Sequence, residues 1–230
     1  MKKSDVEAWN NFNIGRPLFK ARFGDKNISH MMEYDRFLAR TYQSLLRGKK
    51  RAVEYGCGDG SWMHHLAVNN PMREFVGVEW NDTLFNYCME VQKPGVENLE
   101  FVQADMSEPE GILECDVFWS LGGIEHFSES VTVLKGWVDK LTPDGLCFLT
   151  VPNLMNQNWI DKRHKIPPED YLGKDRVITD SYGYAEMWSP NHFINVAVEA
   201  GLEVMESGVM SCLRFEKPLY LKGLKRSDQL

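Results

Sequence analysis

Residues Val53–Gly60 read VEYGCGDG, and this stretch decides the fold of the chain. The apolar segment Ala52–Tyr55 predicts a buried strand that runs directly into glycines at positions 56, 58 and 60. Strand, glycine-rich turn and helix form the nucleotide-binding loop found at the carboxyl edge of parallel sheets. Glycine suits such a loop because it adopts positive φ and lets the backbone approach a ligand. The spacing G-x-G-x-G differs from the G-x-G-x-x-G of dinucleotide binders and from the G-x-x-x-x-G-K-[ST] triphosphate loop.

Strands and helices alternate after this loop. Apolar runs predict strands at Phe75–Glu79, Leu99–Val102, Cys115–Leu121, Leu146–Val151, Leu202–Glu206 and Met210–Phe215. Helical patterns predict helices over 61–69 and 131–140, and a helix that Asn81–Asp82 can cap and that ends before Pro94. A further helix is capped by Ser189 and begins at Pro190. The alternation predicts an α/β fold: a doubly wound, Rossmann-like, mostly parallel sheet of about seven strands with helices on both faces.

The pattern also divides the chain of 230 residues. Residues 1–48 predict an N-terminal helical cap, and residues 49–216 predict the main domain. Within that domain, residues 153–187 break the alternation, and we expect an irregular insertion, which at this length is commonly functional. Its aromatic residues and the basic cluster Arg163–Lys165 favour a lid over a bound molecule, while ordinary packing of the aromatics is the alternative. Residues 217–230 predict a basic, frayed tail.

Composition and charge exclude several classes of protein. The net charge is −7, and because residues 1–51 hold 12 Lys/Arg against 5 Asp/Glu, the rest of the chain is strongly acidic. An acidic body argues against a large nucleic-acid surface. No run of about 18 apolar residues occurs, so we expect no membrane span. The five cysteines form no C-x-x-C pair, and the first residues lack the apolar core of a secretory signal, so we expect reduced thiols and a cytoplasmic location.

The segment Glu54–Gly60, E-x-G-C-G-x-G, resembles motif I of the class I methyltransferases that use S-adenosylmethionine (SAM). Three later blocks strengthen the resemblance. Asp116–Phe127 resembles motif IV of the small-molecule members, Leu141–Asn153 resembles the family's L-x-P-G-G turn and fifth strand, and Ser189–Val204 resembles its last helix and strand. Asp144 stands where the family often has glycine. The resemblance covers about residues 50–153 and 186–206.

The resemblance implies that SAM is the cofactor and S-adenosylhomocysteine (SAH) the product. The methionine half of SAM would lie against the glycine loop, at Glu54, Gly56, Cys57, Gly58 and Gly60. Glu79 would accept the ribose hydroxyls, as the acid after the second strand does in doubly wound nucleotide folds. Trp80, Asp105 and Met106 would meet adenine, and Ser120 and Leu121 would lie near the sulfonium. The alternative for Glu79 is a surface acid, and for Asp105 a turn or helix cap.

Glu125 and His126 are the candidate catalytic residues. Methyl transfer needs mainly in-line positioning of the acceptor, but a hydroxyl acceptor must also lose a proton. An imidazole with an ordinary pKa of about 6.5 suits this task. Glu125 is the other candidate base, and a structural role in which the pair orients its loop is the alternative. The histidines show no metal-ligand spacing and no acidic triad occurs, so we expect a metal-independent enzyme.

The leading hypothesis is therefore a methyltransferase that acts on a small-molecule acceptor, at oxygen more readily than at nitrogen. Nucleic-acid methylation is disfavoured because the fourth strand lacks an (N/D)-P-P-(Y/F) segment. The region Ser120–Phe127 is also similar to the fatty-acid cyclopropane synthases, which are longer and carry a helical lipid-binding insertion. A non-catalytic SAM-binding partner protein is the third alternative. The identity of the acceptor and the oligomeric state stay open.

Overall fold

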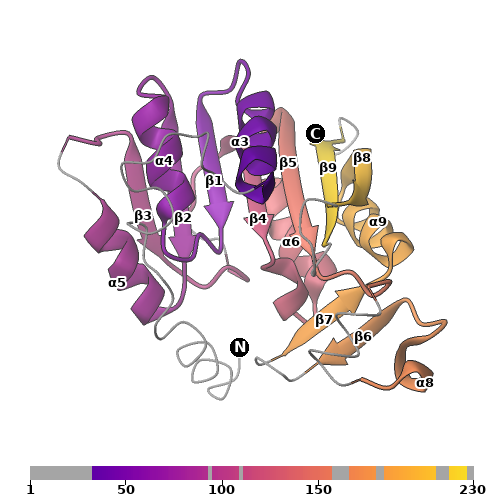
Figure 1. Ribbon diagram of the computed structural model, residues 1–230. Coiled ribbons are helices and arrows are strands. Elements are labelled where there is room, and N and C mark those ends of the chain that lie inside the picture. Colours follow the sequence, from indigo (N-terminus) through magenta and orange to yellow (C-terminus); the bar gives the residue numbers. More distant parts are fainter. Residues whose placement is uncertain are drawn as a thin grey trace.

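The computed structural model describes residues 33–92, 95–108, 111–156, 166–179, 184–210 and 218–226. Its main feature is a seven-stranded sheet of order β3-β2-β1-β4-β5-β9-β8 (Figure 1). The strands are β1 (Arg51–Tyr55), β2 (Glu74–Glu79), β3 (Leu99–Gln103), β4 (Cys115–Leu121), β5 (Leu141–Val151), β8 (Leu202–Val209) and β9 (Leu219–Lys225). The predicted doubly wound α/β fold with about seven strands is confirmed.

Strands β1 to β5 are parallel, whereas β9 pairs antiparallel with both β5 and β8. The chain runs outward from β1 through β2 to β3 and then returns to place β4 on the other side of β1. The order of the strands thus reverses between β1 and β4. In open α/β sheets, ligands bind at the carboxyl ends of the strands beside such a reversal.

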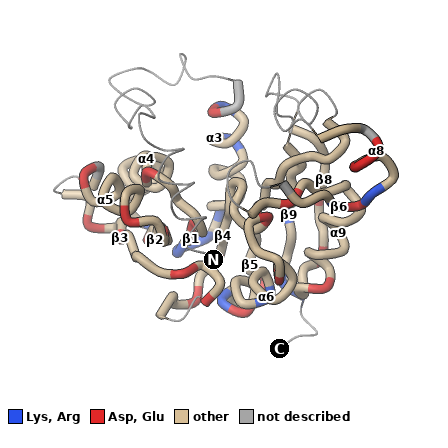
Figure 2. The backbone as a smooth tube through the Cα atoms, turned by 90° about the horizontal axis from the view of Figure 1, so that it is seen from below, with Lys and Arg blue, Asp and Glu red and all other residues tan. Residues whose placement is uncertain are grey.

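Helices cover both faces of the sheet. Helices α3 (Glu33–Leu45), α4 (Ser61–Asn69) and α5 (Asp82–Val91) pack on one face. Helices α6 (Ser130–Asp139) and α9 (Pro190–Glu199) pack on the other. Figure 2, seen from the carboxyl edge, shows α3 and α6 on opposite sides of the strands. In the described part of the chain, no helix has both the length and the apolarity to cross a membrane.

Local sequence explains where several helices begin. The Asn81 side chain accepts a hydrogen bond from the amide of Leu84 at 3.1 Å and caps α5. Ser189 caps α9 in the same way, through the amide of His192, and Pro190 occupies the first turn. Both predicted caps are confirmed, and they satisfy amides that a helix cannot pair internally.

The prediction of a frayed C-terminal tail is wrong. Leu219–Lys225 forms β9, which lies between β5 and β8, and its Leu219 and Leu221 side chains are buried. The strand expected at Met210–Phe215 is not found at Met210, and residues 211–217 lie outside the described residues. Within the described residues, the last strand is β9, where the buried side chains of Leu219 and Leu221 complete the core.

The insertion at 153–187 is more regular than expected. Its described part holds the short helix α8 (Pro168–Tyr171) and a hairpin of β6 (Arg176–Thr179) and β7 (Ala185–Trp188). The amide of Trp188 donates to the carbonyl of Pro152 at 3.1 Å, so the hairpin is anchored where β5 ends. It lies beyond the carboxyl edge of the sheet (Figure 1). Residues 1–32 of the expected cap and the basic cluster Arg163–Lys165 lie outside the described residues.

Candidate functional site

The glycine loop follows β1 at the strand reversal. Gly56, Gly58 and Gly60 have φ of 74°, 61° and 69°, a region that residues with a Cβ avoid. The amides of Gly56 and Cys57 both donate to the carbonyl of Val78, at 2.9 and 3.0 Å. These bonds fold the loop back against the end of β2, so that the loop and β2 form one rigid unit.

Glu79, at the end of β2, is the charged centre of this unit. Its Oε2 accepts a hydrogen bond from the amide of Gly58 at 2.9 Å, and its Oε1 accepts from the amides of Trp80 and Asn81 at 3.0 and 2.9 Å. The side chain is only 3 % exposed. Burial raises its pKa to about 7, while the three amides act in the opposite direction by stabilising the carboxylate.

The loop region offers open space and one acceptor position that the described contacts leave unused. Among the described residues, no atom lies within 4 Å of the position a Cβ would take at Gly58, so the loop backbone faces open space there. A carboxylate has about four acceptor positions, and the described contacts of Glu79 use three. At Gly56, a Cβ would lie 3.3 Å from Sδ of Met106, so the structure brings these two predicted residues together.

Two predicted cofactor residues have other contacts. Asp105 is exposed, and its Oδ1 accepts from the amide and the hydroxyl of Ser107 at 2.8 and 2.7 Å, which is a turn. The thiol of Cys57 is buried 3.8 Å from that of Cys88, and burial raises its pKa. Cys57 can thus offer a ligand its backbone rather than its thiol.

The remaining predicted cofactor residues lie around the same edge. Glu54 is buried near Cys57, where its charge helps to raise the thiol pKa. Trp80 is half-buried beside the core. Ser120 is fully buried, and in the described part of the chain its Oγ has no hydrogen-bond partner. Leu121 is the half-buried last residue of β4. The roles of all these residues toward SAM stay predictions.

Glu125 lies in a 3₁₀ turn, η2 (Ile124–His126), just after β4. Its side chain is 3 % exposed, and Oε2 has no hydrogen-bond partner among the described residues. Burial raises the Glu125 pKa to about 8. The carboxyl group is therefore predominantly uncharged at neutral pH, which makes it a weak base but an available hydrogen-bond donor.

His126 is held by the insertion. Its Nδ1 lies 2.8 Å from the carbonyl oxygen of Tyr184, which precedes β7. Because a carbonyl only accepts hydrogen bonds, Nδ1 carries a proton, and a neutral ring then has its lone pair on Nε2. Nε2 lies 3.9 Å from Oε1 of Glu125, and the side chain is 14 % exposed. Glu125 and His126 are thus adjacent, and Tyr184, which lies outside the main sheet, fixes the orientation of the imidazole.

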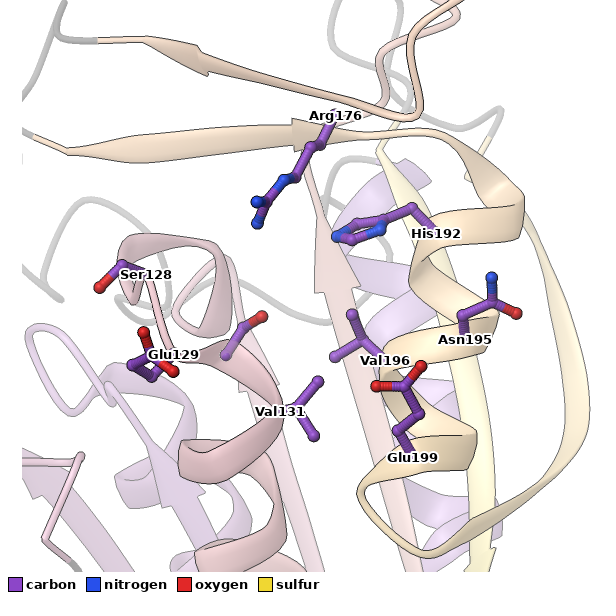
Figure 3. A pocket seen from close by; sticks show the side chains of 9 residues that line it. Ser128, Glu129, Val131, Arg176, His192, Asn195, Val196 and Glu199 are labelled. Carbon is purple, nitrogen blue, oxygen red and sulfur yellow. The ribbon is translucent and has the colours of Figure 1, made fainter.

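A polar cavity of about 210 Å³ lies between the start of α6, β6 and α9. Arg176 of β6 and His192 of α9 line its upper part, as Figure 3 shows. Glu129 and Glu199 line its lower part, from the start of α6 and from α9. Within the described ranges, no three His, Cys, Asp or Glu side chains gather in a way that could hold a metal ion.

The sequence prediction missed two residues of this region. Glu186 is a fully buried carboxylate that binds three side chains of the hairpin, and Arg176 is one of its partners. Tyr184 is the second, one of the aromatic residues of the insertion, whose backbone carbonyl holds His126. The available signal was the alternation of Tyr184, Glu186 and Trp188, which places the three side chains on one face of a strand.

A sequence profile described as a methyltransferase domain matches residues 46–195, well over half of the chain. The strand order, the G-x-G-x-G loop and the reversal at β1 and β4 define the class: a SAM-dependent methyltransferase of class I. The chain belongs to the methyltransferase-domain family. The predicted enzyme class and the SAM cofactor are thereby confirmed.

Solved structures support the fold. The chain is similar to magnesium protoporphyrin IX methyltransferase from Synechocystis PCC 6803 with bound SAH, at 13 % identity and a TM-score of 0.65, over 97 % of this chain and 95 % of that one. It is also similar to a glycopeptide N-methyltransferase, at 13 % identity and 0.63, over 82 % and 95 %. A [4+2]-cyclase matches at 14 % identity and 0.63, over 87 % and 85 %. A search of curated protein sequences finds no significant match.

Proposed function

We propose that this methyltransferase transfers the methyl group of SAM to a hydroxyl group of a small-molecule acceptor, with Nε2 of His126 as the general base. The observation that carries the proposal is the 2.8 Å contact between Nδ1 of His126 and the carbonyl of Tyr184. It assigns the proton to Nδ1, and a base oriented by a third group is the usual arrangement in proton-transfer sites.

Bound SAM supplies a methyl group already activated on a sulfonium. The acceptor oxygen forms a bond to this carbon as the carbon–sulfur bond breaks, and the electron pair of that bond neutralises the sulfur. The acceptor's proton passes to Nε2 of His126 and later to solvent. The rest of the catalytic effect comes from holding the acceptor in line with the methyl group.

Glu125 supports this reaction as an uncharged carboxyl group. Its pKa of about 8 keeps it predominantly protonated at neutral pH, so it adds no negative charge 3.9 Å from the imidazole. Above pH 8 its ionisation would place a buried carboxylate beside Nε2. We therefore assign Glu125 to positioning the acceptor by hydrogen bonding and His126 to proton removal.

For the cofactor, we propose that Glu79 binds the ribose hydroxyls and that the backbone of Gly56–Gly60 meets the methionine half. The open backbone at Gly58 and the acceptor position left on Glu79 support this arrangement. Met106 and Trp80 would form the apolar surface under adenine, with Asp105 at its edge.

We further propose that the hairpin β6–β7 forms one wall of the acceptor site, as part of the lid expected at 153–187. Its anchoring to Pro152 and its contact with His126 support this role. Arg176 and His192 would then give the polar cavity beside it affinity for a polar part of the acceptor. The free thiols of Cys57, Cys88, Cys115 and Cys147 are compatible with a cytoplasmic reaction.

The test is a labelled-methyl assay with acceptor-containing metabolite extracts, using wild type, His126→Gln and the control His65→Gln. Loss of a general base costs about 10²- to 10⁴-fold in rate, so His126→Gln should lose turnover by that range while SAH affinity is retained. His65, on α4, has no place in the proposed site. Equal turnover of His126→Gln and wild type would exclude His126 as the base.

N-methylation is the second candidate, because one similar structure is a glycopeptide N-methyltransferase. The two functions differ in the atom that carries the new methyl group. A carbon–proton correlation spectrum of the labelled product separates O-methyl from N-methyl signals, and it decides between the candidates without assumptions about the acceptor.

A further inference from the structure

Glu186, on β7, is fully buried, at 0 % exposure. Three side-chain donors surround it. Nε1 of Trp188 donates to Oε2 at 2.7 Å, the guanidinium of Arg176 lies 3.3 Å from Oε1, and the hydroxyl of Tyr184 donates to Oε1. A buried charge is stable only when it is paired and hydrogen-bonded, and this carboxylate fulfils both conditions.

The same network reaches the proposed base. Tyr184 donates its hydroxyl to Glu186 and accepts the Nδ1 proton of His126 with its carbonyl. The contact with Glu186 fixes the side chain of Tyr184, and a fixed side chain limits the movement of the carbonyl in the same residue. Arg176 extends the network across the hairpin, since it lies on β6 and pairs with Trp188 of β7.

We propose that Glu186 is a positioning residue for His126: through Tyr184, it holds the imidazole with the proton on Nδ1 and the lone pair on Nε2. This inference rests on the proposed function, in which Nε2 of His126 is the base. Glu186 itself does not reach the reacting atoms. It acts by holding the carbonyl of Tyr184 in place.

The chemistry of the cluster requires a carboxylate. Trp188 and Arg176 can only donate hydrogen bonds, and they approach different oxygens of Glu186, so both oxygens must accept. A glutamine of the same shape offers one oxygen and one NH₂ group, and the NH₂ group would face a donor. Glu186→Gln therefore breaks at least one contact while it keeps the volume of the side chain. Tyr184→Phe removes only the hydroxyl and leaves the backbone carbonyl in the chain.

The inference is tested on the full chain saturated with SAH, labelled with ¹⁵N in histidine. The tautomer of His126 is read from the shifts of its two ring nitrogens, with assignment by comparison with His126→Gln. Wild type and the exposed control Glu169→Gln should show the Nδ1–H tautomer alone. Glu186→Gln and Tyr184→Phe should both show exchange with the Nε2–H form. A wild-type tautomer in both variants would overturn the inference, and a folded Tyr184→Phe decides the matter if Glu186→Gln does not fold.

Turnover gives a second readout. Glu186→Gln should lower kcat by roughly 10- to 100-fold, the range found for partners that orient metal-bound histidines, with little change in SAH affinity. In the His126→Gln background the same change should have no further effect. An equal loss in both backgrounds would mean a merely structural role and contradict the inference. If His126→Gln keeps full turnover, the proposed base is wrong, whereas the tautomer measurement still tests Glu186 by itself.

Discussion

Oε2 of Glu79 accepts a hydrogen bond from the amide of Gly58 at 2.9 Å and thereby joins the end of β2 to the middle of the glycine loop. The two residues are 21 positions apart in the chain. The loop proposed to hold SAM and the acid proposed for its ribose are thus a single structural unit. Disturbing the contact between Gly58 and Glu79 should change cofactor binding more than it changes the fold.

The first prediction concerns Glu79→Gln. A hydrogen bond to a charged group contributes about 1.5–3 kcal/mol, so SAH should bind roughly 10- to 150-fold more weakly. Calorimetric titration with SAH measures the effect. The matched control is Glu74→Gln, at the other end of β2, where the side chain is 67 % exposed. Unchanged affinity in Glu79→Gln would remove Glu79 from the cofactor site.

The second prediction separates two glycines with similar φ. Alanine at either position would have to adopt the left-handed backbone conformation, which costs about 1–2 kcal/mol. At Gly60 its Cβ would also lie 2.5 Å from Cζ of Phe101, whereas at Gly58 it enters open space among the described residues. Gly60→Ala should thus lose about 1–3 kcal/mol more stability through overpacking, and Gly58→Ala should lose mainly SAH affinity. Urea unfolding and calorimetry together measure both quantities, and the reverse assignment would contradict the geometry.

The third prediction is a pH dependence of stability. The Glu125 pKa is about 8 in the folded protein and 4.5 when unperturbed. The protonated carboxyl group of Glu125 therefore makes its full contribution to the free energy of unfolding below pH 4.5. This contribution is lost as the pH rises from 4.5 through 8, with a slope of at most about 1.4 kcal/mol per pH unit. Glu125→Gln removes this titration, so the variant should gain stability relative to wild type between pH 5 and about 8. If urea unfolding gave wild type and Glu125→Gln the same change of unfolding free energy with pH across this window, Glu125 would not be buried in its uncharged form.

The fourth prediction follows from the position of β9. Leu221 is fully buried between β5 and β8, so Leu221→Ala should cost about 2–5 kcal/mol of unfolding free energy. Lys222→Ala, its partly exposed neighbour, is the control. A frayed tail would give the same small effect for both variants in urea unfolding.

Much of the fold could be predicted because most parallel strands contain a run of apolar residues next to glycine, proline or capping residues. In β4, the apolar run Val117–Trp119 is buried on both faces of the sheet, so its position follows from hydrophobicity. The caps at Asn81 and Ser189 were predictable for a similar reason, since they depend on local hydrogen bonds.

What could not be predicted depends on distant partners. The segment Leu219–Lys225 contains both leucines and lysines, and its two lysines are typical of an exposed tail. Only its pairing with β5 and β8 shows that it is a strand. No local pattern indicated that Glu186 is buried. Its carboxylate can be buried only because Arg176, across the hairpin, and the side chains of Tyr184 and Trp188 surround it with hydrogen-bond donors. The hydrogen bond between His126 and Tyr184 spans 58 positions and likewise required the fold.

The most direct test of the account is the identity of the product that wild type and His126→Gln form from methyl-labelled SAM and metabolite extract. The account predicts a small-molecule product with the label on oxygen, formed by wild type and by His65→Gln but reduced about 10²- to 10⁴-fold in His126→Gln. A label on nitrogen or carbon, or equal product formation by His126→Gln, would contradict it.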